Sequence, residues 1–342
     1  MRHRLPVPDP RSGATLTDAV GDLVHVDDEH LVVQTRHGEN GIARADVVAV
    51  KEVPPTPSRR GAPHRALSAA DLQRVMVGAW PPVESEHLGG WLLRASGGFT
   101  QRANSVMTAG DPARPLPAAL EEAEAWYARR GLPPAVTVFG PVGLTAGADP
   151  LGALLLERGY APRVTTTTYT AAVAEVADSV AATPTAGPEV TTTTALDDDW
   201  FAAYTRYREA PEQWARAVLT GSPEQVFAAV RDGGEVLALG RLGVAATWGG
   251  VAAMWTAPEA RRRGLATAVL GALARAARER GVRSVHLQTD DDNDGAVAVY
   301  RRHGFAPHHA YVTLRRPGRG PGPRPAAQPA RGLVQVTSSW GS

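Results

Sequence analysis

Three consecutive arginines and a glycine, residues 261–264, stand directly before a long amphipathic stretch. From Leu265 to Ala277 an apolar residue recurs at every fourth position, which predicts a helix that begins at about Gly264 and ends at Gly281. The first amide groups of a helix have no partner inside it, and the helix dipole adds partial positive charge there. Arginines beside such an end, with a glycine that lets the backbone approach closely, are suited to bind a pyrophosphate.

On its own this short pattern also fits a solvated helix start. The predicted elements around it are therefore needed to choose between this interpretation and an anion site. The expected strands are 235–241, 244–248, 251–256 and 284–289, with a turn at Gly249-Gly250. The expected helices are 199–218, interrupted near Pro211, and 223–231. A strand, a loop, a long helix and a further strand therefore follow each other in order. No Gly-Lys-Ser/Thr is present, which excludes a Walker phosphate loop.

Composition limits the function classes. The 342 residues are enough for two or three domains, and the absence of cysteine excludes disulfides, thiolate metal sites and a cysteine nucleophile. A net charge of +1 gives no general attraction to nucleic acid, and no stretch approaches the about 18 apolar residues of a membrane span. We expect a cytoplasmic protein without membrane or nucleic-acid partners. His303, His308 and His309 lack the spacing of a metal site, so we expect surface histidines and no metal.

Segments rich in proline and glycine separate three predicted folded parts and a tail. Short alternating runs predict a small SH3-like β-barrel over residues 13–53, with a turn at 37–41. Two units of similar plan follow at 65–174 and 189–316, because each contains an Arg-Gly helix end and a Gly-aromatic-Ala-Pro step before a strand. The Pro-, Gly- and Arg-rich residues 317–342 predict a disordered tail.

The first of these two units has polar residues in an apolar region. Residues 91–95 and 99–107 alternate as two strands, and no Arg-x-x-Gly-x-Gly/Ala follows them. A copy without a pyrophosphate loop would be structural or would shape an acceptor pocket. Arg102 and Asn104 are suited to hold a carboxylate, although an outward-facing strand edge explains them equally well.

Residues 189–316 resemble the GNAT acetyltransferase superfamily in the order and spacing of these elements. The whole chain resembles actinobacterial proteins with a small barrel, a degenerate GNAT unit and a C-terminal GNAT unit. Here the degenerate unit carries Trp-Leu-Leu-Arg at 91–94 and Arg-Ala-Asn-Ser at 102–105. The resemblance implies an α/β fold of tandem GNAT units, each a mixed, mostly antiparallel sheet flanked by helices, and acetyl-CoA as co-substrate. The residues that it assigns to acetyl-CoA are Met254, Thr256, Arg261, Arg262, Arg263, Gly264, Leu265, Ala266, Thr267 and Asn293.

The implied reaction transfers acetyl directly from a thioester to an amine, without a covalent enzyme intermediate. By resemblance, Tyr300 lies near the sulfur and protonates the departing thiolate, and Asn293 binds the pantetheine arm; a half-buried core tyrosine and a helix cap are the alternatives. The strand 251–256 would separate from 284–289 and free its backbone for the pantetheine. Because this strand has no glutamate, the base stays open among water, Asp290 and water held by Gln288. 

Some of the resembling proteins are assigned as N-acetylglutamate synthases, which implies a small-molecule amine acceptor such as the glutamate α-amine. Its carboxylates would need cationic or polar partners, for which Arg102, Asn104 and Arg208 are the candidates. A protein N-terminus, a lysine and a drug amine remain open as acceptors. A non-catalytic acyl-CoA sensor or adaptor is the alternative of another class. The sequence does not indicate an oligomeric state.

Overall fold

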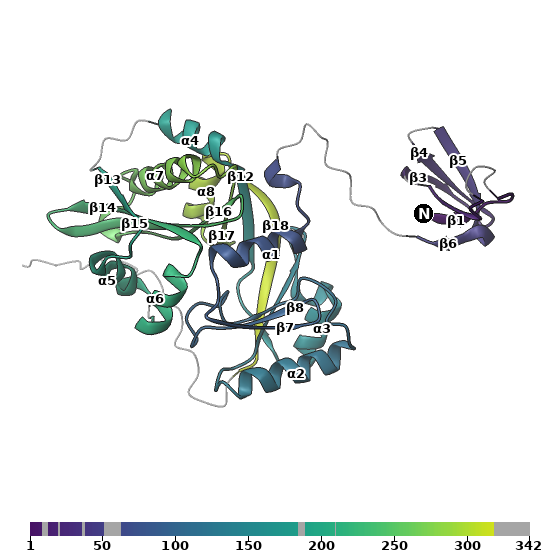
Figure 1. Cartoon of the computed structure of the whole chain (residues 1–342), viewed down its shortest axis with the longest axis horizontal. Helices are drawn as coiled ribbons and strands as arrows, with labels where there is room; N and C mark the ends of the chain where they lie inside the picture. Colours follow the sequence, from purple (N-terminus) through teal and green to yellow (C-terminus); the bar gives the residue numbers. More distant parts are fainter. Residues whose placement is uncertain are drawn as a thin grey trace, which may run out of the picture. The chain divides into compact units, whose positions relative to one another are not determined.

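The computed structural model describes residues 1–8, 13–19, 21–35, 38–50, 63–183, 189–208 and 210–317. The chain divides into two compact units, Met1–Gly61 and Ala62–Ser342 (Figure 1). Apart from Pro317, the tail expected over residues 317–342 lies outside the described residues. Of the helices within the described ranges, none has the length and apolar character that crossing a bilayer requires.

Two three-stranded antiparallel sheets make up the first unit. They have the orders β2 (Leu16–Asp18), β1 (Arg2–Arg4), β6 (Val47–Ala49) and β3 (Gly21–Val26), β4 (His30–Thr35), β5 (Gly38–Ala43). Strand β1 precedes residue 13, at which the expected barrel begins. The turn predicted at 37–41 is wrong over 38–41, because Gly38–Ala43 pairs along β4, and its first residue lies outside the described residues. This hydrogen-bonded ladder overrides the low strand propensity of Gly and Asn.

One twelve-stranded sheet runs through the second unit, in the order β13-β14-β15-β16-β17-β12-β18-β10-β9-β8-β7, with β11 beside β18. Its strands are β7 (Glu84–Leu88), β8 (Trp91–Ala95), β9 (Val106–Met107), β10 (Ala135–Gly140), β11 (Ala161–Pro162), β12 (Thr166–Ala172), β13 (Val190–Thr193), β14 (Glu224–Asp232), β15 (Glu235–Ala245), β16 (Trp248–Thr256), β17 (Ser284–Asp290) and β18 (Ala306–Arg315). Its helices are α1 (Ala69–Ala79), α2 (Leu116–Ala128), α3 (Pro150–Glu157), α4 (Val173–Ala181), α5 (Asp198–Tyr207), α6 (Glu212–Thr220), α7 (Leu265–Glu279) and α8 (Asp294–Arg302). The predicted long helix and the break near Pro211 are confirmed.

The sheet has two halves, a first half from residues 65–174 and a second half from residues 189–316, and each half contains a strand that pairs within the other. Strand β12, which ends the first half, lies between β17 and β18 of the second half and is antiparallel to both. Strand β18 continues on its other edge along β10, from Ala135↔Arg315 to Gly140↔Ala310. The segments 65–174 and 189–316 therefore share one sheet, and each completes the other.

Helices cover both faces of the second half (Figure 1). Helix α7 packs on β14, β15 and β16 with α4 against it, whereas α5 packs on β15 from the opposite face. The helix predicted over 223–231 is wrong, because this segment is strand β14. Its side chains enter two different cores in alternation: Val226, Ala228 and Val230 in one, Phe227 and Ala229 in the other. A strand buried on both faces is apolar throughout, and its pattern then resembles that of a buried helix.

The predicted turn at Gly249-Gly250 is also wrong. Strand β15 ends at Ala245, Ala246 has a φ of 52°, and β16 begins at Trp248. Gly250 instead lies within β16, where a Cβ would be 2.6 Å from the Ala79 side chain and 2.7 Å from the His286 ring. Close packing rather than a turn therefore explains this glycine.

Candidate active site

A cavity of about 510 Å³ lies where β16 and β17 separate. The two strands pair in parallel only from Trp248 to Gly250, so this edge of 251–256 has no strand partner among the described residues. This is the separation that the sequence predicts. Both halves of the sheet contribute to the lining, the first with Arg102 and the second with Tyr300.

A bulge directs the free part of β16 into this cavity. The register with β15 shifts between Leu239 and Arg241, and Ala253 has a φ of 54°, which is rare for a residue with a side chain. Residues 251–254, including Met254, line the cavity. Thr256 lies outside the lining, and its carbonyl accepts a hydrogen bond of 3.4 Å from Nε of Arg261. The backbone groups of β16 that face the cavity are therefore those of residues 251–254 at the bulge, and not those of Thr256 at the end of the strand.

The arginine-glycine loop ends at the open N-terminus of α7. Arg262 and Gly264 both have left-handed φ angles, 61° and 79°, and Gly264 supplies no side chain to cap the helix. The guanidinium groups of Arg261 to Arg263 are exposed and make no ion pair within the described ranges. This end therefore combines uncapped amides with free positive charge, which is the arrangement predicted for a pyrophosphate.

The first turn of α7 anchors this loop. Leu265 is buried in the core, and the half-buried Ala266 adds little bulk. The hydroxyl of Thr267 lies 3.4 Å from Nε2 of His303, whose other ring nitrogen is 3.0 Å from the Ser179 hydroxyl. The residues of the loop and first turn are thus held in place, while their role with acetyl-CoA stays a prediction.

The histidines expected at the surface are not there. His303 and His309 are fully buried and His308 is half-buried. His309 is 2.8 Å from Nε2 of Gln73 and 2.8 Å from the ring of His308, and burial lowers its pKa to about 3. The expectation is wrong because these polar partners permit burial of the rings. Within the described ranges, no group of three or more His, Asp or Glu residues could hold a metal ion.

Tyr300 and Asn293 both line the cavity. The Tyr300 side chain is buried, its ring packs edge-to-face on Phe305 at 5.8 Å, and its hydroxyl makes no hydrogen bond within the described part of the chain. Burial raises the pKa of Tyr300 to about 12, so the phenol stays protonated at neutral pH. Asn293 caps α8, because its Oδ1 accepts from the Ala296 amide at 3.2 Å. Its Nδ2 has no partner among the described residues.

Three arginines give the cavity lining positive charge. Arg102 lies 5.2 Å over the Trp80 ring, and its buried Nε has no hydrogen-bond partner in the described part of the molecule. Burial lowers the pKa of Arg102 below its usual value. Arg163 and Arg208 complete the cationic lining. Asp290 is the single acid of the described lining, and it already accepts a hydrogen bond of 2.7 Å from the Thr166 hydroxyl.

Asn104 has a different environment from Arg102. Its Oδ1 accepts from the amides of Ser96 and Gly98, and its Nδ2 donates to the carbonyls of Phe99 and Thr100. All four hydrogen-bonding positions of this amide are used within one loop, so the geometry gives it a structural role in place of the predicted contact with a carboxylate. The loop also replaces most of the strand predicted over 99–107, of which only β9 is extended.

Arg241 is a residue that sequence reasoning missed. It is fully buried on β15 and donates to the carbonyls of Leu219 and Ala79 and to the Ser222 hydroxyl, at 2.7 to 2.8 Å. Its guanidinium lies 5.3 Å from the ring of Trp80, which also carries Arg102. Arg241 thus helps to hold in place the Trp80 ring over which the Arg102 guanidinium lies. An arginine inside an otherwise apolar strand pattern is the signal that could have identified it.

Comparison with known proteins adds independent findings. A family model described as "Probable histone acetyltransferase Rv0428c C-terminal" matches residues 68–314, and one described as "Rv0428c N-terminal Sm-like domain" matches residues 1–51. The Mycobacterium tuberculosis protein "Probable histone acetyltransferase Rv0428c" is 37% identical over 139 residues, which cover 40% of this chain and 42% of that relative. The match thus spans less than half of this relative.

A second relative is matched over nearly its whole length. The Bacillus subtilis protein "Uncharacterized N-acetyltransferase YobR" is 28% identical over 243 residues, 70% of this chain and 96% of that protein. Among solved structures, a GCN5-related N-acetyltransferase from Kribbella flavida superposes with a TM-score of 0.55 at 19% identity and covers 73% of this chain and 96% of its own. The predicted GNAT fold class is confirmed.

Proposed function

We propose that this chain, which belongs to the family of the Rv0428c acetyltransferase and is a GNAT-type N-acetyltransferase, acetylates a small amine that carries a carboxylate, with acetyl-CoA as donor. One observation carries the proposal. The free hydroxyl of Tyr300, the bulge of β16 and the unpartnered guanidinium of Arg102 all line the same cavity. A proton donor, free backbone groups and a carboxylate partner are thereby available around one reacting centre.

Residues of the cavity lining, together with the loop before α7 that lies outside this lining, fit acetyl-CoA. The uncapped start of α7 and the exposed arginines 261–263 suit a pyrophosphate, and the unpaired edge of β16 suits the amides of a pantetheine arm. Asn293 offers its free Nδ2 beside this edge of the lining. These features support acetyl-CoA as co-substrate.

In direct transfer, the amine nitrogen attacks the thioester carbonyl, the carbon–sulfur bond breaks and the thiolate leaves. Backbone donors near the bulge would stabilise the oxyanion. Tyr300 would give its proton to the thiolate, because its hydroxyl has no hydrogen-bond partner among the described residues, belongs to the cavity lining and is protonated at neutral pH. The amine must lose a proton before it attacks. Asp290 and Gln288 line the cavity and could hold the water that accepts this proton.

The charge of the cavity favours an anionic acceptor. Arg102, Arg163 and Arg208 face one acid, Asp290, in the described lining. A carboxylate on the acceptor would pair with these guanidinium groups, and the glutamate α-amine meets this requirement. A basic histone-type tail, suggested by the name of the Mycobacterium relative, would meet charge of its own sign.

Release of free thiol from acetyl-CoA tests the proposal across amino acids, polyamines, aminoglycosides and a histone-tail peptide. We expect release with carboxylate-bearing amines, glutamate first among them, and little with the basic peptide. Release of thiol with the histone-tail peptide alone would reject a carboxylate-bearing amine as the acceptor. Acetyl-CoA binding without release for any acceptor would instead favour the sensor alternative.

A further inference from the structure

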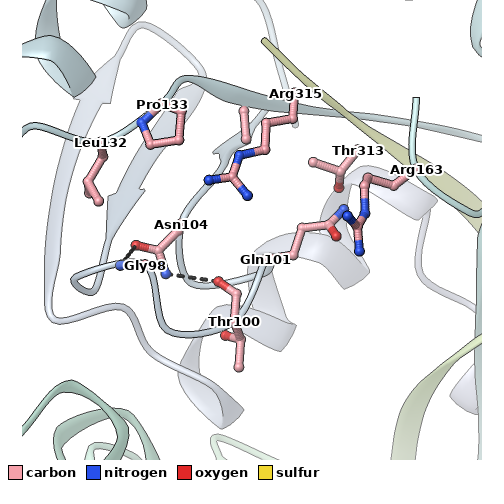
Figure 2. A pocket seen from close by; sticks show the side chains of 10 residues that line it. Gly98, Thr100, Gln101, Asn104, Leu132, Pro133, Arg163, Thr313 and Arg315 are labelled. Atoms are coloured by element: carbon pink, nitrogen blue, oxygen red, sulfur yellow. Dashed lines mark hydrogen bonds between the residues drawn. The ribbon is translucent and has the colours of Figure 1, made fainter. Parts of the chain in front are cut away.

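A second, smaller pocket of about 190 Å³ adjoins the main cavity (Figure 2). The two share Thr100, Gln101 and Arg163 as lining residues, so they are contiguous. The rest of its lining comes from the loop that contains Gly98 and Asn104, from the segment before and at the start of β10, and from the end of β18 with Arg315. It is therefore formed at the strand exchange that joins the two halves of the sheet.

Positive charge without a counter-charge marks this pocket. Arg163 and Arg315 line it, and the described lining contains no acid. Neither guanidinium makes a hydrogen bond or ion pair within the described residues. The adjacent Arg316, by contrast, pairs with Glu124 at 2.9 Å, and Arg158 pairs with Glu121 at 3.5 Å. The two arginines of the pocket thus differ from paired arginines on the same half.

The loop that faces these arginines is rigid. Asn104 holds it with four hydrogen bonds, and Thr100 keeps a φ of 55° while its hydroxyl accepts from the Trp80 indole at 3.1 Å. The amide of Gln101 has no partner within the described part of the chain. Figure 2 shows the Arg163 and Arg315 side chains extending from the strand side toward this loop. The hydrogen-bonded loop thus forms one wall of the pocket, and the exposed side chains of Arg163 and Arg315 offer free donors toward it.

We infer that this pocket binds the distal carboxylate of an acceptor whose amine and first carboxylate occupy the main cavity. Guanidinium groups bind carboxylates through paired, charge-assisted hydrogen bonds, and Gln101 can add a third donor. The inference rests on the proposed function and narrows its substrate class to amino dicarboxylic acids. The specificity-determining residues are Arg163 and Arg315.

The kinetic test uses Arg315→Met in the full chain, with Arg316→Met as the matched control. We expect the KM for glutamate to rise by about 10-fold or more, the size of a lost charge-assisted contact. The KM for glutamine should stay within about twofold, and Arg316→Met should leave both values unchanged. Arg163→Met should repeat the loss for glutamate. Equal effects on glutamate and glutamine, or no effect on either, would overturn the inference.

Binding without turnover separates this inference from the proposed function. Calorimetry compares glutarate, which has two carboxylates and no amine, with butyrate on the wild-type chain and on Arg315→Met. We expect glutarate to bind at least about 10-fold more tightly than butyrate, and the substitution to abolish this difference. If that holds while no amino acid is acetylated, the subsite stands and the proposed function fails. If glutamate is acetylated while both acids bind alike, the subsite is rejected.

Discussion

Arg94 and Arg102 lie eight positions apart, and they show what separates a structural arginine from a functional one. Arg94 is buried, and its guanidinium donates to the carbonyl and to the hydroxyl of Ser105, both at 2.9 Å. Arg102 lines the cavity with its Nε unpartnered among the described residues. Because buried polar groups are normally satisfied, the orphan donor indicates a ligand.

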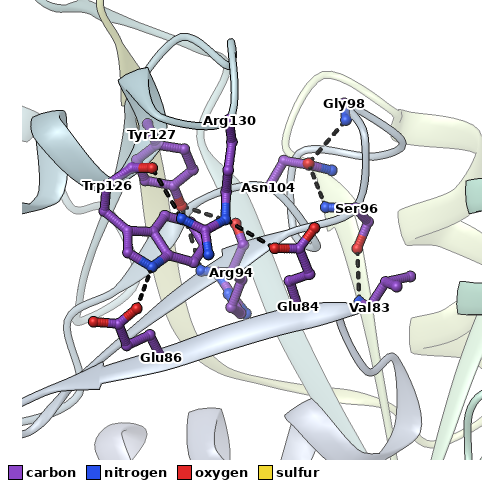
Figure 3. A network of polar contacts seen from close by, with 10 residues as sticks. All are labelled: Val83, Glu84, Glu86, Arg94, Ser96, Gly98, Asn104, Trp126, Tyr127 and Arg130. Carbon is purple, nitrogen blue, oxygen red and sulfur yellow. Dashed lines mark hydrogen bonds and ion pairs between the residues drawn. The ribbon is translucent and has the colours of Figure 1, made fainter.

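The surroundings of the two arginines extend the contrast. Around Arg94 the partners are complete: Trp126 donates to Glu86 at 2.6 Å, Arg130 pairs with Glu84 at 2.9 Å, and the Tyr127 hydroxyl donates to the Arg94 carbonyl (Figure 3). In the cavity that Arg102 lines, the hydroxyl of Tyr300 likewise has no hydrogen-bond partner within the described part of the chain. The network around Arg94 is thus satisfied, whereas Arg102 and Tyr300 bring groups without partners to the cavity.

Tyr300→Phe should have the largest effect, because it removes the free hydroxyl and keeps the ring. We expect kcat to fall by about 10²- to 10⁴-fold, the usual contribution of a general acid, while the Kd for acetyl-CoA stays unchanged. Tyr169→Phe is the control, since it removes a hydroxyl from an equally buried ring outside the cavity. Stopped-flow turnover and calorimetry measure the two quantities. Loss of acetyl-CoA affinity in place of kcat would make Tyr300 a packing residue.

Reversal of charge at the loop should come next. In the double variant Arg262→Glu with Arg263→Glu, we expect the Kd for acetyl-CoA to rise by about 100-fold, because two attractive charges become repulsive beside a diphosphate. Arg275→Glu reverses an exposed charge of the same helix away from its start and should change the Kd little. Similar Kd values in all three proteins would exclude the loop from the acetyl-CoA site.

The pair Arg94→Met and Arg102→Met tests the contrast itself. Arg94→Met removes the side-chain donor to the Ser105 carbonyl and one of the two donors to the Ser105 hydroxyl, so the free energy of unfolding should fall by about 2 kcal/mol with KM unchanged. Arg102→Met removes a donor without a partner, so stability should change by less than about 1 kcal/mol while the KM for glutamate rises by about 10-fold. Urea denaturation and acceptor kinetics measure both. Equal changes in the free energy of unfolding and in KM for the two variants would show that Arg94 and Arg102 do not differ in role.

The sequence predicts much of the second half of the cavity, because the signals there are local. Four-residue periodicity marks α7 and Gly264 marks its start, while Tyr300 is identified by the resemblance to GNAT proteins. The exchange of β12 and β18 is a non-local pairing that no local pattern encodes. The subsite at Arg315 depends on that exchange, so it could not be predicted.

Burial is the second reason why some predictions from the sequence are wrong. Strand β14 is covered on both faces, so its alternation is lost and the sequence resembles a helix. Asn104 and Arg102 look alike in sequence, as polar residues in an apolar stretch. Only the structure distinguishes an amide with four partners from a guanidinium with a free donor. Residue type thus indicates the chemistry, whereas satisfaction of hydrogen bonds indicates the role.

Two buried histidines provide the smallest and most discriminating test of this rule. His309 has partners at both ring nitrogens, whereas His286 has none at either within the described residues. At pH 7.5, His309→Leu leaves the Gln73 side-chain amide and Nδ1 of His308 without their partner and should lower the free energy of unfolding by about 1–3 kcal/mol. His286→Leu removes an unsatisfied ring and should change it by less than about 1 kcal/mol.

The pH dependence of stability tests the burial of His286 separately. Burial, with added repulsion from Arg102 and His309, lowers the pKa of His286 to about 3, against about 6.5 in an unfolded chain. Below pH 6.5 the unfolded state therefore binds a proton that the folded state does not. The stabilisation from the neutral ring is complete above pH 6.5 and is lost as the pH falls toward 3. His286→Leu should flatten urea-derived stability between pH 6.5 and 5 relative to wild type, and an unchanged slope would show that His286 is already protonated or solvated in the fold.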